Sequence, residues 1–386
     1  MSLKDRLGRL TGERDTPSST NTGNEAISEL RRKIDNVMNR RERFAPAGIP
    51  EMRRDAMPLA DIVAGEEART PSGNFFLSRS ALTANYAHGN CRICDIAHPS
   101  MGAAAFLAGH QSLKDMSVAD GLFLDTETTG LAGGTGTFPF LIGLGWFEAD
   151  SFITCQLFAR DFSEESAVLT HLKELASTKE FLVTFNGRAY DLNLLSARFI
   201  LNRCQDTMSA MPHIDLLHPS RRIFAHRLEN ARLATIETQI LGVRRDGDVP
   251  GFEIPQRYFD WLRQRDGRLL ADVFEHNRVD IVSMASLLKY LADLIEGGER
   301  MTHAHHGDLL KLAGLVHERG DLQKAGRILE ALIMSYQPGV AMDARRSLSL
   351  IYKKAYRWSE AAGLWQDLLT SNPYDVFAAE ELGTCQ

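Results

Sequence analysis

The chain has 386 residues, of which 44% are hydrophobic and 24% are charged, and its formal net charge is −6. This length predicts about two domains or a little more, with enough apolar residues for a sizeable core. The negative balance excludes a global basic field, so any contact with nucleic acid has to come from local patches.

Five cysteines in a chain of this length do not indicate a disulfide scaffold. The first residues, Met-Ser-Leu-Lys-Asp-Arg, lack the apolar run of a secretory signal. No apolar run in the sequence approaches the ~20 residues of a membrane helix. We therefore expect a cytoplasmic, reduced protein with no membrane partner.

The first 50 residues predict a disordered arm that carries a basic amphipathic helix. Residues 11–24 are polar and rich in residues that break helices. Over residues 25–43, apolar side chains recur at helical spacing, and the opposite face is strongly basic. Such a face is more often solvated, although it could also touch a partner or nucleic acid.

Residues 51–115 predict an extension that packs on the core, because their periodicity is weak and Gly and Pro are scattered through them. Within this segment, four residues have zinc-ligand chemistry: His88, Cys91, Cys94 and His98. All four lie within eleven residues, whereas structural zinc sites usually draw their ligands from two separated segments. We favour an ordinary extended segment with reduced thiols over a zinc site.

Residues 116–297 predict an α/β domain. A buried strand that begins near Gly121 is followed by apolar runs at 140–147 and 152–159, which predict an antiparallel meander of three strands. The short apolar run at 181–185 suits a buried central strand. The result is a mixed sheet, with an antiparallel meander and parallel strands, flanked by helices.

Five helices are expected between and after these strands, because apolar residues recur there at helical spacing. They are predicted over residues 164–177, 191–202, 228–241, 257–265 and 269–295.

Residues 303–386 predict an all-α helical-repeat domain. Leu322-Gln-Lys-Ala aligns with Trp358-Ser-Glu-Ala at an offset of 36 residues. Repeats close to this length resemble tetratricopeptide repeats, which are helix pairs. Two units bury little surface alone, so we expect them to pack on the preceding domain or on a protein partner.

Two acids, Asp125 and Glu127, end the first strand of the α/β domain. Residues i and i+2 of a strand project to the same face, so both carboxylates would aim at one point. Hard divalent cations such as Mg²⁺ and Mn²⁺ choose oxygen ligands of this kind. Taken alone, the pair is as consistent with a solvated strand end as with a metal site.

Two further acidic motifs follow in the chain. Asp191 comes just after a strand, at the start of a helix, and His276-Asn-Arg-Val-Asp280 lies within the long helix. Residues i and i+4 share a helix face, so His276 and Asp280 can face the same cleft. Four unpaired acids would repel one another strongly there, and metal ions remove that cost.

In this order the motifs resemble a known family. Asp-x-Glu-Thr-Thr-Gly from Asp125, Asn-x3-Tyr-Asp from Asn186 and His-x3-Asp from His276 are similar to the DEDD 3′–5′ exonucleases, the DnaQ-like branch of the ribonuclease-H-like fold. The string over 124–145 looks like the YprB-type ribonuclease-H-like proteins in particular. The resemblance covers residues 120–295 and implies an exonuclease with two divalent metal ions, Mg²⁺ or Mn²⁺.

The resemblance also implies catalytic roles. The four metal-binding acids of the family correspond to Asp125, Glu127, Asp191 and Asp280. His276 matches the position of the general base. Family members that use His usually place four residues before the last Asp, whereas three separate them here, as in members that use Tyr. His276 could therefore deprotonate the attacking water or orient it.

Three residues are expected to contact the substrate. Asn186 matches an asparagine that lies near the terminal nucleotide in the family, and Thr128 would cradle the 3′ end. Arg188 is the best single candidate for phosphate contact. The arginine-rich stretch 221–245 is as consistent with phosphate contact as with solvated helix faces. Asp215 is interpreted as a supporting or structural acid, since four acids are already accounted for.

The sequence thus favours a Mg²⁺- or Mn²⁺-dependent 3′–5′ exonuclease that acts on single-stranded DNA or RNA by a two-metal mechanism. One alternative is a nucleic-acid-binding scaffold with a vestigial nuclease core, whose helical repeats recruit a protein partner. A third hypothesis is endonucleolytic cleavage within an RNA–DNA hybrid.

Overall fold

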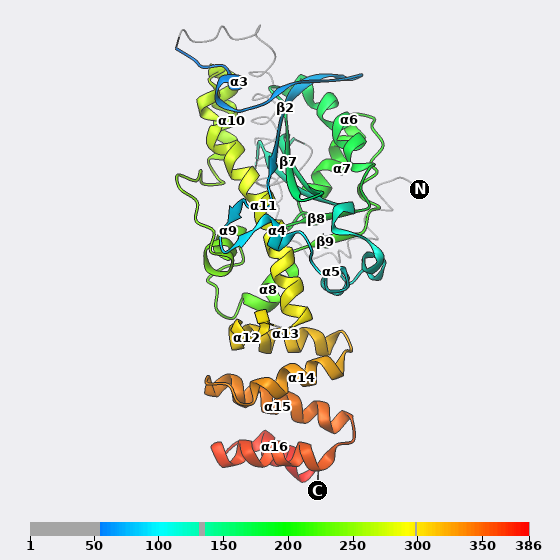
Figure 1. The fold of residues 1–386 in the computed structure, drawn as a ribbon, viewed down its shortest axis with the longest axis vertical. Helices are drawn as coiled ribbons and strands as arrows, with labels where there is room; N and C mark the ends of the chain where they lie inside the picture. Colours follow the sequence, from blue (N-terminus) through cyan, green and yellow to red (C-terminus); the bar gives the residue numbers. More distant parts are fainter. Residues whose placement is uncertain (1–54, 131–135, 298, 386) are drawn as a thin grey trace, which may run out of the picture. The chain divides into compact units, whose positions relative to one another are not determined.

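The computed structural model describes residues 55–130, 136–297 and 299–385 (Figure 1). The predicted arm over residues 1–50 and its helix lie outside these residues. A seven-stranded mixed sheet has the strand order β1-β2-β7-β6-β5-β8-β9, and β3 and β4 form a separate two-stranded hairpin.

The centre of the sheet is β5 (Gly121–Thr128). It pairs antiparallel with β6 (Pro139–Glu148), and β6 pairs antiparallel with β7 (Ser151–Phe158). On its other side β5 pairs parallel with β8 (Phe181–Thr184). The predicted meander and the mixed sheet are therefore confirmed, and the fold is ribonuclease-H-like.

The strand β9 (His213–Asp215) pairs parallel with β8 and was not predicted. With three residues it is too short to show a strand periodicity in the sequence. Its pairing places Asp215 directly opposite Thr184, next to the turn that precedes α7 (Asp191–Leu201).

A hairpin of β1 (Glu66–Thr70) and β2 (Gly73–Leu82) extends the other edge of the sheet. Strand β2 pairs antiparallel with β7, so a segment that was predicted only to pack on the core contributes two strands to it. Most side chains of β1 and β2 are partly or fully exposed, and only Phe75, Phe76 and Leu82 of β2 are buried. This pattern explains the missing alternation in the sequence.

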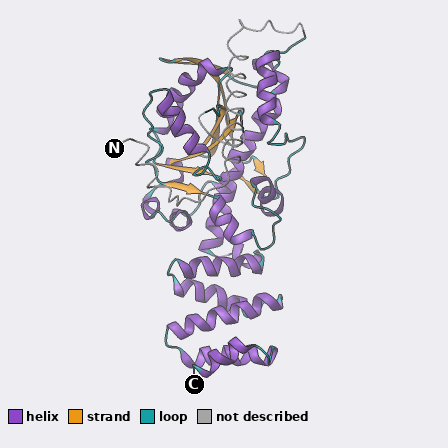
Figure 2. Ribbon diagram, turned by 180° about the vertical axis from the view of Figure 1, so that it is seen from behind, coloured by secondary structure: helices purple, strands orange, loops and turns teal. Residues whose placement is uncertain are grey.

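Helices flank the sheet on both sides. Figures 1 and 2 place the strands between α6 (Glu165–Ala176) and α7 (Asp191–Leu201) on one side and α10 (Ile254–Gln264) and α11 (Ala271–Glu296) on the other. Long helix α11 contacts β5, β6 and β7. The remaining elements of this part are α3 (Leu59–Ile62), β3 (Ala87–His88), β4 (Cys91–Arg92), α4 (Ile93–Ile96), α5 (Met101–Ala108) and α8 (Leu217–Phe224), with 3₁₀ turns at Gln111–Asp115, Val118–Asp120, Phe162–Glu164 and Gly267–Leu269.

The helix predicted over residues 228–241 begins later than predicted, at Leu233. The side chain of Asn230 accepts hydrogen bonds from the Arg232 N–H and the Thr235 hydroxyl, so the chain turns there. A short helix, α9 (Leu233–Ile236), follows and widens into a π-helical turn at Glu237–Leu241. Single π turns are frequent at functional sites.

Apolar side chains fill both faces of the sheet. On β5, Phe123 belongs to one buried cluster, whereas Leu122 and Leu124 belong to another on the opposite face. Burial on both faces explains the continuous apolar run of this strand. The cluster that contains Phe123 also includes Leu309 and Leu312 of α13, so the C-terminal helices share a core with the α/β part.

The C-terminal region is helical throughout its described residues, as predicted. It consists of α12 (Glu299–His303), α13 (His306–Glu318), α14 (Leu322–Leu332), α15 (Pro338–Lys354), α16 (Trp358–Ser371) and α17 (Val376–Gly383). Helices α14 and α16 begin 36 residues apart, which matches the predicted repeat offset. Their assignment to the tetratricopeptide family and the predicted domain boundaries stay predictions.

The segment with zinc-ligand chemistry holds a structural histidine. The Nε2 atom of His88 lies 2.8 Å from the Ser283 hydroxyl on α11, and the ring is buried. Cys94 is exposed. Among the described residues, this segment is not one of the groups whose ligand atoms converge on a point. The contact shows that His88 fastens the β3–β4 hairpin to α11.

Within the described residues, no helix combines the length and the apolar character that a membrane crossing requires.

The two buried histidines predict a loss of stability in acid. Burial lowers the pKa of both His88 and His213 to about 4. Between that value and the ordinary 6.5 the unfolded chain binds more protons, so stability falls as pH drops through this window. The expected loss at pH 5 is about 2 kcal/mol for each ring.

Urea unfolding at pH 7.5 and pH 5 measures this loss. His88→Gln should reduce the difference between the two pH values, whereas the same change at the exposed His303 of α12 should leave it unchanged. An equal pH dependence in all three proteins would contradict the assignment.

Candidate metal centre

The carboxyl end of β5 carries the two acids that the sequence places there. Glu127 is buried and Asp125 is partly buried. The Oδ1 atom of Asp191, the first residue of α7, accepts a hydrogen bond from the Thr126 hydroxyl between them. This contact brings the second acidic motif to the end of β5.

The third motif reaches the same point from α11. The ligand atoms of Glu127, His276 and Asp280 all lie within 4.8 Å of one another. The Oδ2 atom of Asp125 accepts a 2.9 Å hydrogen bond from Asn277 of the same helix. The ligand atoms of Glu127, Asp280 and His276 therefore converge, and Asp125 and Asp191 are held beside them through Asn277 and Thr126.

The acids of this group repel one another. Burial raises the pKa of Asp125 and of Glu127 well above their usual ranges, and the neighbouring carboxylates, among them Asp280 and Asp191, raise both further. Burial also raises the pKa of Asp191 to about 6. Desolvated carboxylates that repel one another need a positive partner.

His276 lies between two acids. Its Nδ1 atom lies 2.7 Å from the Oδ1 atom of Asp248 and 3.2 Å from Arg245 Nη1, and its Nε2 atom lies 3.5 Å from Asp280 Oδ2. Asp248 was not predicted, because it lies in a loop 28 residues before His276 and belongs to no motif.

Asn277 is a second residue that the sequence analysis missed. It is fully buried and links Asp125 of β5 to β7. Its Oδ1 atom accepts a 3.0 Å hydrogen bond from Gln156 on β7. Gly143 of β6 makes room for it, because a Cβ there would lie 2.2 Å from Asn277 Oδ1. The signal available in the sequence was the position of Asn277 directly after His276, within the third motif.

Arg245 is a third. The sequence analysis grouped it with arginines that could contact phosphate, but its guanidinium is bound by acids. It donates to both oxygens of Glu237, at 2.7 Å from Nε to Oε2, and to Asp280 Oδ1. Its Nη1 atom also lies 3.5 Å from Asp248 Oδ2. The arginine therefore lies at the edge of the acidic group.

The predicted substrate residues lie on the turns around the acids. The backbone N–H groups of Asn186 and Arg188 donate to the two oxygens of Asp215, at 2.8 and 3.1 Å. Asn186 has a φ of 69°, so this carboxylate holds a strained turn just before Asp191. The side chain of Arg188 is exposed, and the Thr128 hydroxyl donates to the Gly130 carbonyl.

Asp215 thus acts as a support for the loop, in agreement with its interpretation as a structural acid. The substrate roles of Thr128, Asn186 and Arg188 stay predictions.

A polar cleft of about 370 Å³ opens beside His276. The β3–β4 hairpin, the loop 242–248 and α11 form its walls. Its lining includes three arginines, Arg244, Arg245 and Arg278, and four acids, Asp246, Asp248, Asp272 and Glu275. Arg278 is bound by Glu275, so the cleft presents charges of both signs at the edge of the acidic group.

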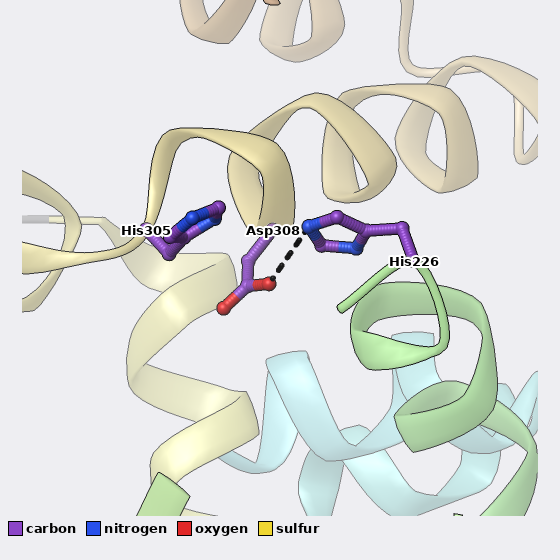
Figure 3. A group of neighbouring side chains, drawn as sticks. All are labelled: His226, His305 and Asp308. Atoms are coloured by element: carbon purple, nitrogen blue, oxygen red, sulfur yellow. Dashed lines mark ion pairs between the residues drawn. The ribbon is translucent and has the colours of Figure 1, made fainter. Parts of the chain in front are cut away.

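A second group of metal-ligand side chains lies where α13 meets α8. Figure 3 shows the rings of His226 and His305 on either side of Asp308. Arg227 binds both carboxylate oxygens of Asp308, at 2.8 and 2.7 Å, and His305 Nδ1 accepts the Gly307 N–H. These partners already neutralise the buried Asp308, so the group is a hydrogen-bonded joint that fixes α13.

Two comparisons with known proteins agree with this fold. Residues 122–292 match a family model described as RNase_H superfamily. The chain is also 35% identical over 254 residues to "Uncharacterized protein YprB" of Bacillus subtilis (strain 168). That alignment covers 64% of this chain, and the chain spans only 60% of the length of that relative.

Residues 122–292 form a ribonuclease H superfamily domain. All four candidate acids lie within the matched residues, and so do His276, Asp248 and Arg245. The DEDD exonuclease branch is a finer assignment that these matches do not reach.

The contact between Gly143 and Asn277 predicts the effect of a single methyl group. In Gly143→Ala the new Cβ would push the Asn277 amide away from Asp125, and overpacking of this kind costs roughly 1–3 kcal/mol. Urea unfolding measures the loss. In the matched control Gly363→Ala on α16, a Cβ meets nothing within 4 Å, so stability should be unchanged or slightly higher.

Repulsion between the acids predicts that removal of one stabilises the metal-free protein. Burial and the neighbouring acids raise the pKa of Asp125 above its ordinary value of 3.8, so the folded protein loses stability as pH rises above that ordinary value. In EDTA at pH 8, Asp125→Asn should therefore raise the free energy of unfolding. The same change at Asp150, an exposed acid of the β6–β7 turn, should have no effect. Destabilisation by Asp125→Asn would contradict this account.

Proposed function

We propose that the chain is a metal-dependent 3′–5′ exonuclease of the DEDD type that hydrolyses single-stranded DNA or RNA. The observation that carries the proposal is the group of Glu127, Asp280 and His276, with Asp125 and Asp191 close to it at the end of β5. The ribonuclease H superfamily match supports a nuclease, and the order of the three motifs favours the exonuclease branch.

The donor set fits divalent cations. It consists of carboxylate oxygens, which are the ligands that Mg²⁺ and Mn²⁺ prefer. Burial and mutual repulsion hold the pKa of Asp125 and Glu127 high, which is the expected state of metal ligands without their cation. We assign the binding of two such ions to the four acids. When bound, the ions would lower the pKa of water and stabilise the leaving oxygen.

His276 suits the role of general base. We assign the ring proton to Nδ1, which faces Asp248, so that Nε2 would accept a proton from a water molecule at the acid cluster. The imidazolium that forms would be stabilised by the Asp248 carboxylate. Asn277 keeps the Asp125 carboxylate in place through its hydrogen bond to Oδ2.

Substrate contacts are assigned to the turns beside the acids. Asn186 and Thr128 would bind the terminal nucleotide at the 3′ end. The exposed Arg188 would bind a backbone phosphate. The C-terminal helices, which pack on α8 through the Arg227–Asp308 pair, would offer a surface for a protein partner. We further propose a cytoplasmic location.

Digestion of a 3′-labelled oligonucleotide with Mg²⁺ or Mn²⁺ tests the proposal. We expect stepwise loss of 3′ nucleotides from single strands, and Asp125→Asn should lower the rate by at least about 10²-fold. His276→Gln should lower the rate without abolishing metal binding, because its proposed role is proton transfer. Persistent inertness of the natural chain, identical to that of Asp125→Asn, would reject the proposal.

Two substrate variants separate the alternatives. Blocking the 3′ end should stop an exonuclease but not an endonuclease, and an RNA–DNA hybrid tests internal cleavage. Calorimetric titration with Mn²⁺ identifies a vestigial core, which should show no binding that depends on Asp125.

A further inference from the structure

Arg245 is a largely buried arginine that lies beside the four acids. Its side chain is only 10% exposed, and its neighbours include the acids Glu237, Asp248 and Asp280 and the ring of His276. It binds Glu237 with two hydrogen bonds and Asp280 with one. A buried arginine is thus attached to one of the four carboxylates to which the proposed function assigns metal binding.

The anchor of Arg245 is built into the fold. Glu237 is 1% exposed and lies in the π-helical turn, which packs against α11. The two parallel hydrogen bonds from Arg245 form the strong fork geometry of an arginine–carboxylate pair. Glu237 therefore anchors the guanidinium through Nε and Nη2 independently of Asp280.

The contact with Asp280 gives the cluster a positive charge of its own. Attraction from Arg245 lowers the pKa of both Asp125 and Glu127, against the opposing effects of burial and the other acids. The oxygen of Asp280 that accepts the arginine is engaged, however, and a metal ion beside it would meet a guanidinium charge at close range. Two cations repel strongly in a site with so little water.

We propose that Arg245 is the resident counter-cation of the metal-free site, and that it releases Asp280 when a divalent cation binds there. The inference rests on the proposed function, because it takes Asp280 as a metal ligand. Arg245 is a positioning residue in this account and competes with the metal for one carboxylate.

The released guanidinium has a place to go. Arg245 lines the 370 Å³ cleft together with Arg244 and Arg278. Its bonds to Glu237 do not depend on Asp280, so the arginine can turn toward the cleft while it stays anchored. There it would meet the phosphate of a nucleotide substrate, two of whose oxygens can accept the paired N–H groups of the planar guanidinium.

Calorimetric titration with Mn²⁺ in the absence of nucleic acid tests the competition. Arg245→Met alone would leave Glu237 buried and unpaired, so we compare the double variant Arg245→Met/Glu237→Gln with Glu237→Gln. The double variant should bind Mn²⁺ roughly tenfold more tightly or better, which is the scale of one charge-assisted hydrogen bond. Arg244→Met, which removes the same charge from the exposed neighbour, should change the affinity much less.

The outcomes separate the two proposals. If Mn²⁺ binds the natural chain in a manner that Asp125→Asn abolishes, but the double variant binds no more tightly than Glu237→Gln, only the counter-cation inference is overturned. Weaker binding by the double variant would overturn it as well and show that Arg245 supports the metal ligands. If no variant shows binding that depends on Asp125, both proposals fall.

Discussion

The repulsion among buried carboxylates is the constraint on which the site depends. Asp125, Glu127, Asp191 and Asp280 come from three separate elements, and burial raises the pKa of the first three, so their ionised forms are costly. The fold compensates with donors that are directed at individual oxygens. The Thr126 hydroxyl, the Asn277 amide and the Arg245 guanidinium each serve a different acid of the group. The protein can therefore fold with these acids together while the remaining negative charge favours cations.

The architecture brings the acids together through connections that end at one edge of the sheet. Parallel strands β5 and β8 present their carboxyl ends at the same edge, and Asp191 follows β8 by a short turn. Asp215 at the end of the next parallel strand holds that turn through two backbone N–H groups. Each strand of this half thus contributes an acid, but only the acid of β9 is used for support.

The sequence alone predicted the strands, helices and acids that depend on the local pattern of apolar and polar residues. The apolar runs of β5 to β8 and the long helix α11 carry clear periodicity, and the acids stand at element ends where spacing fixes their direction. It was not sufficient for β1, β2 and β9, because an exposed edge hairpin and a three-residue strand leave no such pattern. For a related reason the sequence did not predict the roles of Asp248, Asn277 and Arg245. These roles arise from contacts across the fold and not from spacing along the chain.

The position of α11 connects these observations. Gly143 and Gly145 lie on one face of β6, and a Cβ at either would collide with Asn277 or with Ile281, which are one helical turn apart. The two glycines therefore leave room for α11 to pack close to the sheet in one register. In this position Asn277 of α11 donates a hydrogen bond to Asp125, and Ser283 contacts His88 on the next turn. Because His276 and Asp280 belong to the same rigid helix, a slide of α11 along the sheet would misplace the base, the acid and the amide together. The precision of the centre thus depends on two missing side chains in β6 as much as on the charged residues themselves.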